Sequence, residues 1–431
     1  MAPPPDARQR RFRDYLDRLG AALGHRDRAE PLRAYLTALC LAGERKSVEP
    51  MAARIDPRHV SARHQSMHHF VANAPWDERG LLGVVREEVL PALERHGPIA
   101  ACVVDDTGIP KKGSHSVGVA RQYCGALGKT ENCQVAVSLS LVNEVGSLPV
   151  AWRLYLPREW TRDRARCRAA GIPSSARFRE KWRIALEEIA ALRAQGILQA
   201  PVVADAGYGS TTDFRDELTA WEIPYLVGVE GHISVWPPGE GPLPPARYRG
   251  RGRPPTRLRR SPRHRPLSAL RLARQLPAEA WSTVTWRQGT RGAMRSRFAL
   301  ARVRSAHRDF RRCEARPEEW LLLEWPRGEG EPTKYWLSTL PETATLGLLV
   351  RVAKIRWRIE RDFEELKDDF GLDHFEGRGW RGFHHHGPLC IAAYGFLVAE
   401  RARLSPPEPL SFLRSAPIPR GFKPRGSASA A

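Results

Sequence analysis

Long apolar runs, paired cysteines and acidic residues are all scarce in this sequence of 431 residues. No apolar run approaches the roughly 18 residues that a membrane-spanning helix needs, and the start, MAPPPDARQRRFRDYL, lacks the apolar core of a secretory signal. The seven cysteines are scattered and never spaced as CxxC, which argues against a disulfide framework and a structural zinc site. These absences predict a cytoplasmic protein with no membrane partner.

The shortage of acidic residues leaves a large positive charge. Lys and Arg number 69 against 48 Asp and Glu, so the formal net charge is 69 − 48 = +21. A field of that sign attracts polyanions, and nucleic acid is the common polyanionic partner of so basic a protein, ahead of an anionic membrane. The alternative is a basic surface that serves only solubility.

Two patterns divide the first half of the chain. Residues 1–95 show apolar positions at helical spacing, for example Tyr15, Leu19 and Leu23, and a basic helical segment suits a DNA-binding module. Residues 96–232 alternate short β-branched runs with helical segments. This alternation predicts an α/β fold with helices packed on a mixed sheet.

The second half begins with a loop and returns to helices. Residues 233–344 contain a Pro/Gly/Arg-rich loop followed by strand-like runs such as EWLLLEW, which together predict a β-rich insertion. Helical spacing resumes over residues 345–404 and continues the α/β domain. The Pro/Ser/Ala-rich residues 405–431 predict a disordered tail.

Carboxylates stand at the ends of two apolar strands. Asp105 and Asp106 follow IAACVV, and Asp205 follows PVVA. Open α/β sheets bind ligands beyond such strand ends. The alternative role of each aspartate is to cap a helix or form a turn.

A third carboxylate lies on a predicted helix. Ile355, Ile359 and Phe363 begin an apolar stripe, and Glu360 falls at its border. A surface ion-pair ladder competes with a functional role, because this helix is charged on most sides. Two aspartates and a glutamate without Cys or His suit Mg²⁺ or Mn²⁺. Two such ions catalyse in-line phosphoryl displacement, which with the positive charge indicates chemistry on DNA phosphodiesters.

Three stretches carry a family resemblance. VVDDTGIPKKGSHSVGVARQYCGALGKTENCQVAVSLSLV, VVADAGYG and RWRIERDFEELKDDFGLDHFEGRGWRG resemble the DDE endonuclease domain of insertion-sequence transposases, in particular the insertion sequence 701 family. The resemblance implies an RNase H-like fold with a β-rich insertion before the glutamate. It also implies Asp106, Asp205 and Glu360 as catalytic metal ligands, with Asp105 turned aside.

The resemblance extends to a signature around the glutamate. Its Arg, Glu and Lys match Arg356, Glu360 and Lys367, whereas Ala353 replaces the expected Tyr. The signature implies DNA contacts by Arg356 and Lys367, and the tyrosine's contact is missing here. The implied activity is metal-dependent cleavage of the ends of a mobile element and strand transfer into double-stranded DNA, with residues 1–95 binding the ends. Homodimer formation on DNA, within the nucleoid, is compatible with this activity.

Further candidates come from composition. The loop arginines Arg247, Arg249, Arg251 and Arg253 are predicted to bind DNA. RGRGRPP resembles a minor-groove hook, but phosphate contact without sequence preference is the favoured reading. The three histidines at 384–386 could suggest a metal, but neighbouring Gly and Pro predict a loop instead. Trp281 and Trp286 could stack on a base or pack in a core.

Two other functions remain open at this point. A non-catalytic DNA-binding regulator could derive from the same family, and a nuclease could hydrolyse DNA without joining strands. The intact Asp106, Asp205 and Glu360 argue against the regulator. Only a strand-transfer assay separates the nuclease from the transposase.

Overall fold

A computed structural model describes residues 5–250, 252–290 and 292–405. Its strands are β1 (Ala101–Pro110), β2 (Ala120–Cys124), β3 (Lys129–Val142), β4 (Ser147–Leu154), β5 (Val202–Ala204), β6 (Tyr225–Val229), β7 (Ser234–Trp236), β8 (Leu267–Ser268), β9 (Ser282–Gly289), β10 (Gly292–Ser305), β11 (Glu319–Trp325) and β12 (Lys334–Ser338). Its helices are α1 (Pro5–Ala22), α2 (Ala29–Cys40), α3 (Val48–Ile55), α4 (Val60–Ala72), α5 (Glu78–Glu94), α6 (Arg158–Arg162), α7 (Arg164–Ala169), α8 (Lys181–Ala194), α9 (Ala206–Gly209), α10 (Thr212–Ala220), α11 (Ala269–Gln275), α12 (Leu346–Lys354), α13 (Trp357–Asp368) and α14 (Trp380–Leu404).

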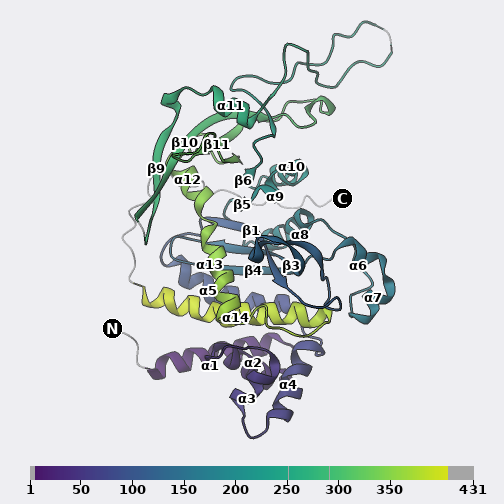
Figure 1. Cartoon of the computed structure of the whole chain (residues 1–431), viewed down its shortest axis with the longest axis vertical. Coiled ribbons are helices and arrows are strands. Elements are labelled where there is room, and N and C mark those ends of the chain that lie inside the picture. The colour runs from purple at the N-terminus through teal and green to yellow at the C-terminus, as the bar shows by residue number, and fades with distance from the viewer. Residues whose placement is uncertain (1–4, 251, 291, 406–431) are drawn as a thin grey trace, which may run out of the picture.

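A single mixed sheet organises the molecule (Figure 1). Twelve strands of the described residues join in the order β2-β3-β1-β5-β6-β12-β11-β10-β7-β8, with β4 paired to β3 and β9 to β10. Strand β1 runs antiparallel to β3 and parallel to β5, and β5 runs parallel to β6. Helices flank this sheet, which confirms the predicted RNase H-like fold class.

The predicted β-rich insertion extends the same sheet. Strand β12 pairs antiparallel with β6, with Tyr335 opposite Val229, and β11 and β10 follow outward. The insertion and the first α/β segment are therefore joined by backbone hydrogen bonds rather than by a linker alone.

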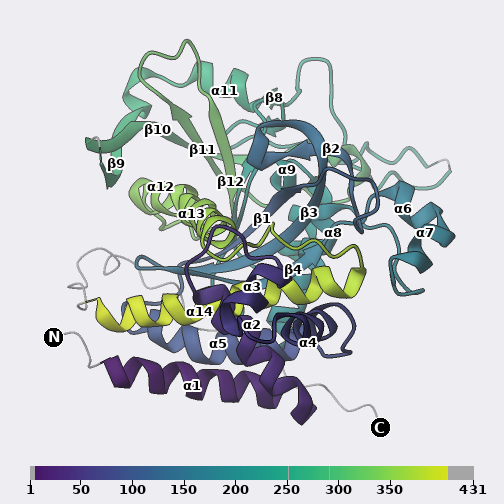
Figure 2. The same cartoon turned by 60° about the horizontal axis from the view of Figure 1, so that its bottom comes forward.

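The N-terminal helices share the main core with the sheet. Figure 1 shows α1 to α4 on the side of α14 away from the sheet, and Figure 2 shows α5 running alongside α14. The Tyr15 hydroxyl donates a 2.9 Å hydrogen bond to the Ala392 carbonyl, and the Phe12 ring lies 4.8 Å from the Phe396 ring. Residues of these helices and of strands β1, β3 and β4 belong to one continuous apolar cluster. The helices before residue 95, which were predicted as a separate domain, thus share one packed core with the residues that follow.

Two expectations concern the ends and the membrane. The predicted disordered tail lies outside the described residues beyond Ser405. Within the described part of the chain, no helix is long and apolar enough to cross a bilayer.

Candidate active site

The two adjacent aspartates of β1 point to opposite faces of the sheet. Side chains alternate along a strand. Val103 packs in the core that contains Ile359 of α13, whereas Val104 packs in the core on the other face. By this alternation the carboxyl groups of Asp105 and Asp106 leave β1 on opposite sides, and they contact different cations.

Asp105 lies beside a buried arginine. The Arg356 Nη2 atom donates to the Asp105 Oδ2 atom at 2.9 Å, and the same nitrogen lies 4.0 Å from the Asp205 Oδ2 atom. The Asp105 and Arg356 side chains are only 16% and 24% exposed. One guanidinium, at the junction of α12 and α13, therefore faces two carboxylates: Asp105 in β1 and Asp205 directly after the parallel strand β5.

Asp106 makes a different ion pair. Its Oδ2 atom accepts a hydrogen bond from the Nζ atom of Lys181, the first residue of α8. Asp105, which was expected to turn aside, thus contacts the arginine that also lies near Asp205. The expected approach of Asp106 to Asp205 stays a prediction.

Asp205 is held by the start of a short helix. Its Oδ1 atom accepts hydrogen bonds from the backbone N–H groups of Gly207 at 2.9 Å and Tyr208 at 3.3 Å. Strand β6 presses on this turn so closely that a Cβ atom on Gly209 would lie 2.0 Å from the Gly228 carbonyl oxygen. The glycines of VVADAGYG thus allow α9 to sit against the sheet and aim Asp205 toward Arg356.

Glu360 lies near the ion pair of Asp105 and Arg356 but makes no contact with it. It lies exposed in the first turn of α13, one turn after Arg356. Burial alone would lower the pKa of Arg356, but Asp105 and Asp205, with Glu360, raise it above its usual value. Across residues 5–250, 252–290 and 292–405, no three His, Cys, Asp or Glu side chains are placed to hold one metal ion. The expected convergence of three carboxylates is therefore absent.

Burial and charge shift the proton affinity of Asp105. Burial raises the pKa of this carboxyl to about 6, Arg356 lowers it, and the neighbouring Asp205 and Asp106 raise it. The expected repulsion among the carboxylates contributes to the raised pKa of Asp105, but burial is the larger cause of that rise. Arg356 softens the repulsion, as expected.

The other predicted DNA contacts occupy two environments. The Lys367 Nζ atom donates to the Gly108 carbonyl of β1 at 3.1 Å, and burial lowers the pKa of this lysine. Arg247, Arg249 and Arg253 are exposed in the irregular segment between β7 and β8, and Arg251 lies outside the described residues. The loop arginines are thus accessible, whereas Lys367 braces β1 against α13.

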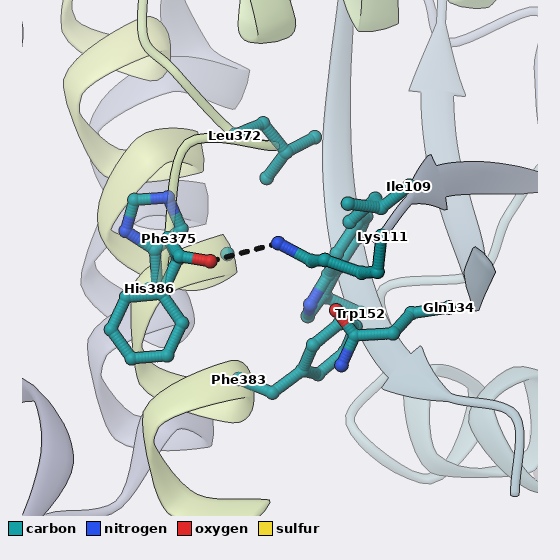
Figure 3. Close-up of a pocket in the computed structure, with 9 residues that line it drawn as sticks. Ile109, Lys111, Gln134, Trp152, Leu372, Phe375, Phe383 and His386 are labelled. Atoms are coloured by element: carbon teal, nitrogen blue, oxygen red, sulfur yellow. Dashed lines mark hydrogen bonds between the residues drawn. The ribbon is translucent and has the colours of Figure 1, made fainter. Parts of the chain in front are cut away.

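The three adjacent histidines lie inside α14, not in a loop. His385 lies between the carbonyl oxygens of Val71 and Trp76, at 3.0 Å from each. Burial lowers the pKa of His384, His385 and His386 to about 4, so all three are neutral at pH 7. Figure 3 shows His386 beside a cavity of about 10 Å³, room for one water at most. His385 and His386 thus connect the N-terminal helices to α14, the latter through the Tyr35 hydroxyl.

Trp281 and Trp286 both pack against other aromatic side chains. The Trp281 ring lies 5.3 Å from Trp325, and the Trp286 ring lies 5.7 Å from Phe298. Packing is therefore their observed role.

A buried network on α13 was not predicted from the sequence. Asp362 accepts hydrogen bonds from the Ser147 hydroxyl of β4 at 2.5 Å and the Tyr394 hydroxyl of α14 at 2.7 Å. Its position three residues after Ile359, on the buried side of the helix, is the signal that could have indicated it. The network fixes the helix that carries Glu360.

Asp362→Asn is expected to change how stability depends on pH. Burial raises the pKa of Asp362 from 3.8 to about 6, although Ser147 and Tyr394 lower it. The folded state therefore binds more protons than the unfolded state between these values, so the free energy of unfolding falls as pH rises through this window, by about 3 kcal/mol in total. Urea unfolding from pH 4 to pH 7 should show that the variant lacks this decline. If the free energy of unfolding changed equally with pH in both proteins, Asp362 would not be the source of the decline.

Comparison with known proteins adds two findings. A family model described as DDE superfamily endonuclease matches residues 18–293. Over 202 residues the chain is 31% identical to the "Probable transposase for insertion sequence element IS701" of Microchaete diplosiphon, a match covering 47% of this chain and 49% of that protein. The chain therefore spans about half the length of this curated relative. The family match includes Asp105, Asp106 and Asp205, and Glu360 lies beyond it.

Proposed function

Because the chain belongs to the DDE superfamily endonucleases, we propose that it is a transposase that cleaves the ends of a mobile element and joins them to target DNA. The observation that carries this proposal is that Asp105 and Asp205 both lie near the Arg356 guanidinium, at the start of the helix that bears Glu360. We assign the first catalytic carboxylate to Asp105 in place of Asp106.

The chemical type of the donors, all carboxylate oxygens, suits a hard divalent cation, although their present spacing does not hold one ion. Asp105 and Asp205 bring two negative charges to a single guanidinium, and Glu360 adds a third nearby. Asp105, Asp205 and Glu360 would hold Mg²⁺ or Mn²⁺ as oxygen ligands. Two such ions, when bound, activate the attacking oxygen and stabilise the leaving one.

The protein's own groups position the reactants. The N–H groups of α9 orient Asp205, and the Asp362 network fixes α13. Arg356 can bind a DNA phosphate with the same guanidinium that now holds the aspartates, because both are oxyanions. The exposed Arg247, Arg249 and Arg253 supply further phosphate contacts, and a homodimer would bring two element ends together.

A cleavage assay tests the proposal against its two rivals. The substrate is duplex DNA carrying the sequences that flank the gene, incubated with protein and Mg²⁺ or with a chelator in place of the metal. A transposase should nick this DNA only with metal and then join the freed 3′-hydroxyl to a second duplex. Binding without nicking would indicate a regulator, and nicking without joining a nuclease.

A further inference from the structure

The hydroxyl of Tyr208 is buried without a hydrogen-bond partner. Tyr208 lies in α9, the short helix that follows β5 (Figure 1). It is only 2% exposed, and its ring lies 6.0 Å from the Phe214 ring in the main core. Among the described residues, none donates to or accepts from its Oη atom. Such a hydroxyl loses its hydrogen bonds to water on folding and gains none in return, which destabilises the fold. Packing of the ring therefore does not explain the hydroxyl.

The backbone brings Tyr208 close to the aspartates of the candidate active site. Strands β1 and β5 run parallel, with Val103 opposite Val203. Asp105 and Asp205 each follow two residues later, so they lie at the same level of the sheet. The Tyr208 N–H donates a hydrogen bond of 3.3 Å to the Asp205 Oδ1 atom. The tyrosine is thus part of the turn that holds one of these carboxylates.

The aspartate charges act on the Tyr208 hydroxyl. Burial raises the pKa of Tyr208 well above its usual value, and the charges of Asp106, Asp105 and Asp205 raise this pKa further. Arg356 lowers it. Charges produce such shifts at short range. The hydroxyl therefore lies close to these carboxylates, although it is hydrogen-bonded to none of them.

The two aspartates of β1 are held by cations instead. The Arg356 Nη2 atom donates to Asp105 at 2.9 Å, and the Lys181 Nζ atom donates to Asp106. A guanidinium or an ammonium group can also bind a DNA phosphate. A carboxylate released in this way requires another donor. Tyr208 offers a buried hydroxyl whose capacity to donate is unused.

We propose that Tyr208 is a positioning residue, whose hydroxyl donates a hydrogen bond to the β1 aspartate that binds a divalent cation. This role rests on the proposed function. A donor of this kind fixes the orientation of the carboxylate and favours its ionised form. Removing such a partner of a metal-binding group weakens metal binding about 10- to 100-fold. The ring contributes nothing to this effect, so Tyr208→Phe separates positioning from packing.

The first test compares the stability of two Tyr→Phe variants of the full chain. Tyr208→Phe removes the unpartnered hydroxyl and keeps the ring beside Phe214. Tyr225→Phe, the matched control, removes a buried hydroxyl of β6 that donates to the Glu319 Oε2 atom at 2.8 Å. Without divalent cations, Tyr208→Phe should melt no lower than the unchanged protein, whereas the control should melt lower because Glu319 loses its partner. A lower melting temperature for Tyr208→Phe would assign its hydroxyl to the core and overturn the proposal.

A second measurement tests metal binding directly. The Kd for Mn²⁺, measured by isothermal titration calorimetry, should increase about 10- to 100-fold in Tyr208→Phe and stay unchanged in Tyr225→Phe. The same Kd in all three proteins, or no binding of Mn²⁺ to any of them, would overturn the proposal. Binding of Mn²⁺ that depends on Tyr208, in a protein that does not cleave DNA, would sink the proposed function and leave the role of Tyr208 standing.

Discussion

Asp105→Asn is expected to lower DNA cleavage at least about a thousandfold, while Asp106→Asn keeps most of the activity. In such reactions a metal ion stabilises the charge of the transition state by several kcal/mol. Each 1.4 kcal/mol corresponds to a tenfold change in rate. Asp105 shares the Arg356 guanidinium with Asp205, whereas Asp106 pairs with Lys181. The two substitutions are matched in chemistry and differ by one position.

Two measurements separate the neighbouring aspartates. Cleavage rates give the catalytic effect, and the rise in melting temperature on adding Mn²⁺ reports metal binding without catalysis. We expect the rise in the unchanged protein and in Asp106→Asn, and its loss in Asp105→Asn. The reverse result would return the assignment to Asp106.

Deleting residues 1–95 is expected to unfold the remaining chain rather than to remove DNA recognition alone. The N-terminal helices cover α14, and their apolar side chains belong to the same cluster as those of β1, β3 and β4. Exposing this surface removes the hydrophobic burial that stabilises the sheet. The truncated chain should lack a cooperative thermal transition by circular dichroism.

Tyr15→Phe is the matched control for the deletion. It removes only the hydroxyl that donates to the Ala392 carbonyl and leaves the ring packed on Phe396. One such hydrogen bond contributes about 1 kcal/mol, so this variant should melt cooperatively. A truncated chain that melts as sharply as this control would restore the idea of a separate N-terminal module.

The strands and most helices could be predicted from sequence because their periodicities are strong. The runs around IAACVV, PVVA and EWLLLEW all form strands, and Gly196 ends α8 with a φ of +70°. The histidines were misplaced because Gly387 and Pro388 usually break a helix. Here the Gly387 position is so close to the Trp152 ring that a Cβ atom would lie 2.3 Å from its Nε1 atom. Such packing is invisible in a single sequence.

The candidate site was predictable in its residue types but not in its geometry. Because IAACVV is apolar on both faces, periodicity could not decide whether Asp105 or Asp106 contacts Arg356. The choice depends on which helix covers which face, a tertiary property. Arg356 was predicted as a DNA contact, and the structure adds its ion pair with Asp105.

The position of α14 has a consequence for synthesis of the protein. Helix α14 follows every other described helix and strand in the chain, yet it lies between the N-terminal helices and the sheet. Domains made early in translation can fold as they leave the ribosome. Here the helices of residues 5–94 must wait, with apolar surface uncovered, until residues 380–404 have been made. The nascent chain therefore completes this core only after residues 380–404 have been made, and until then a holdase chaperone can bind the uncovered apolar surface.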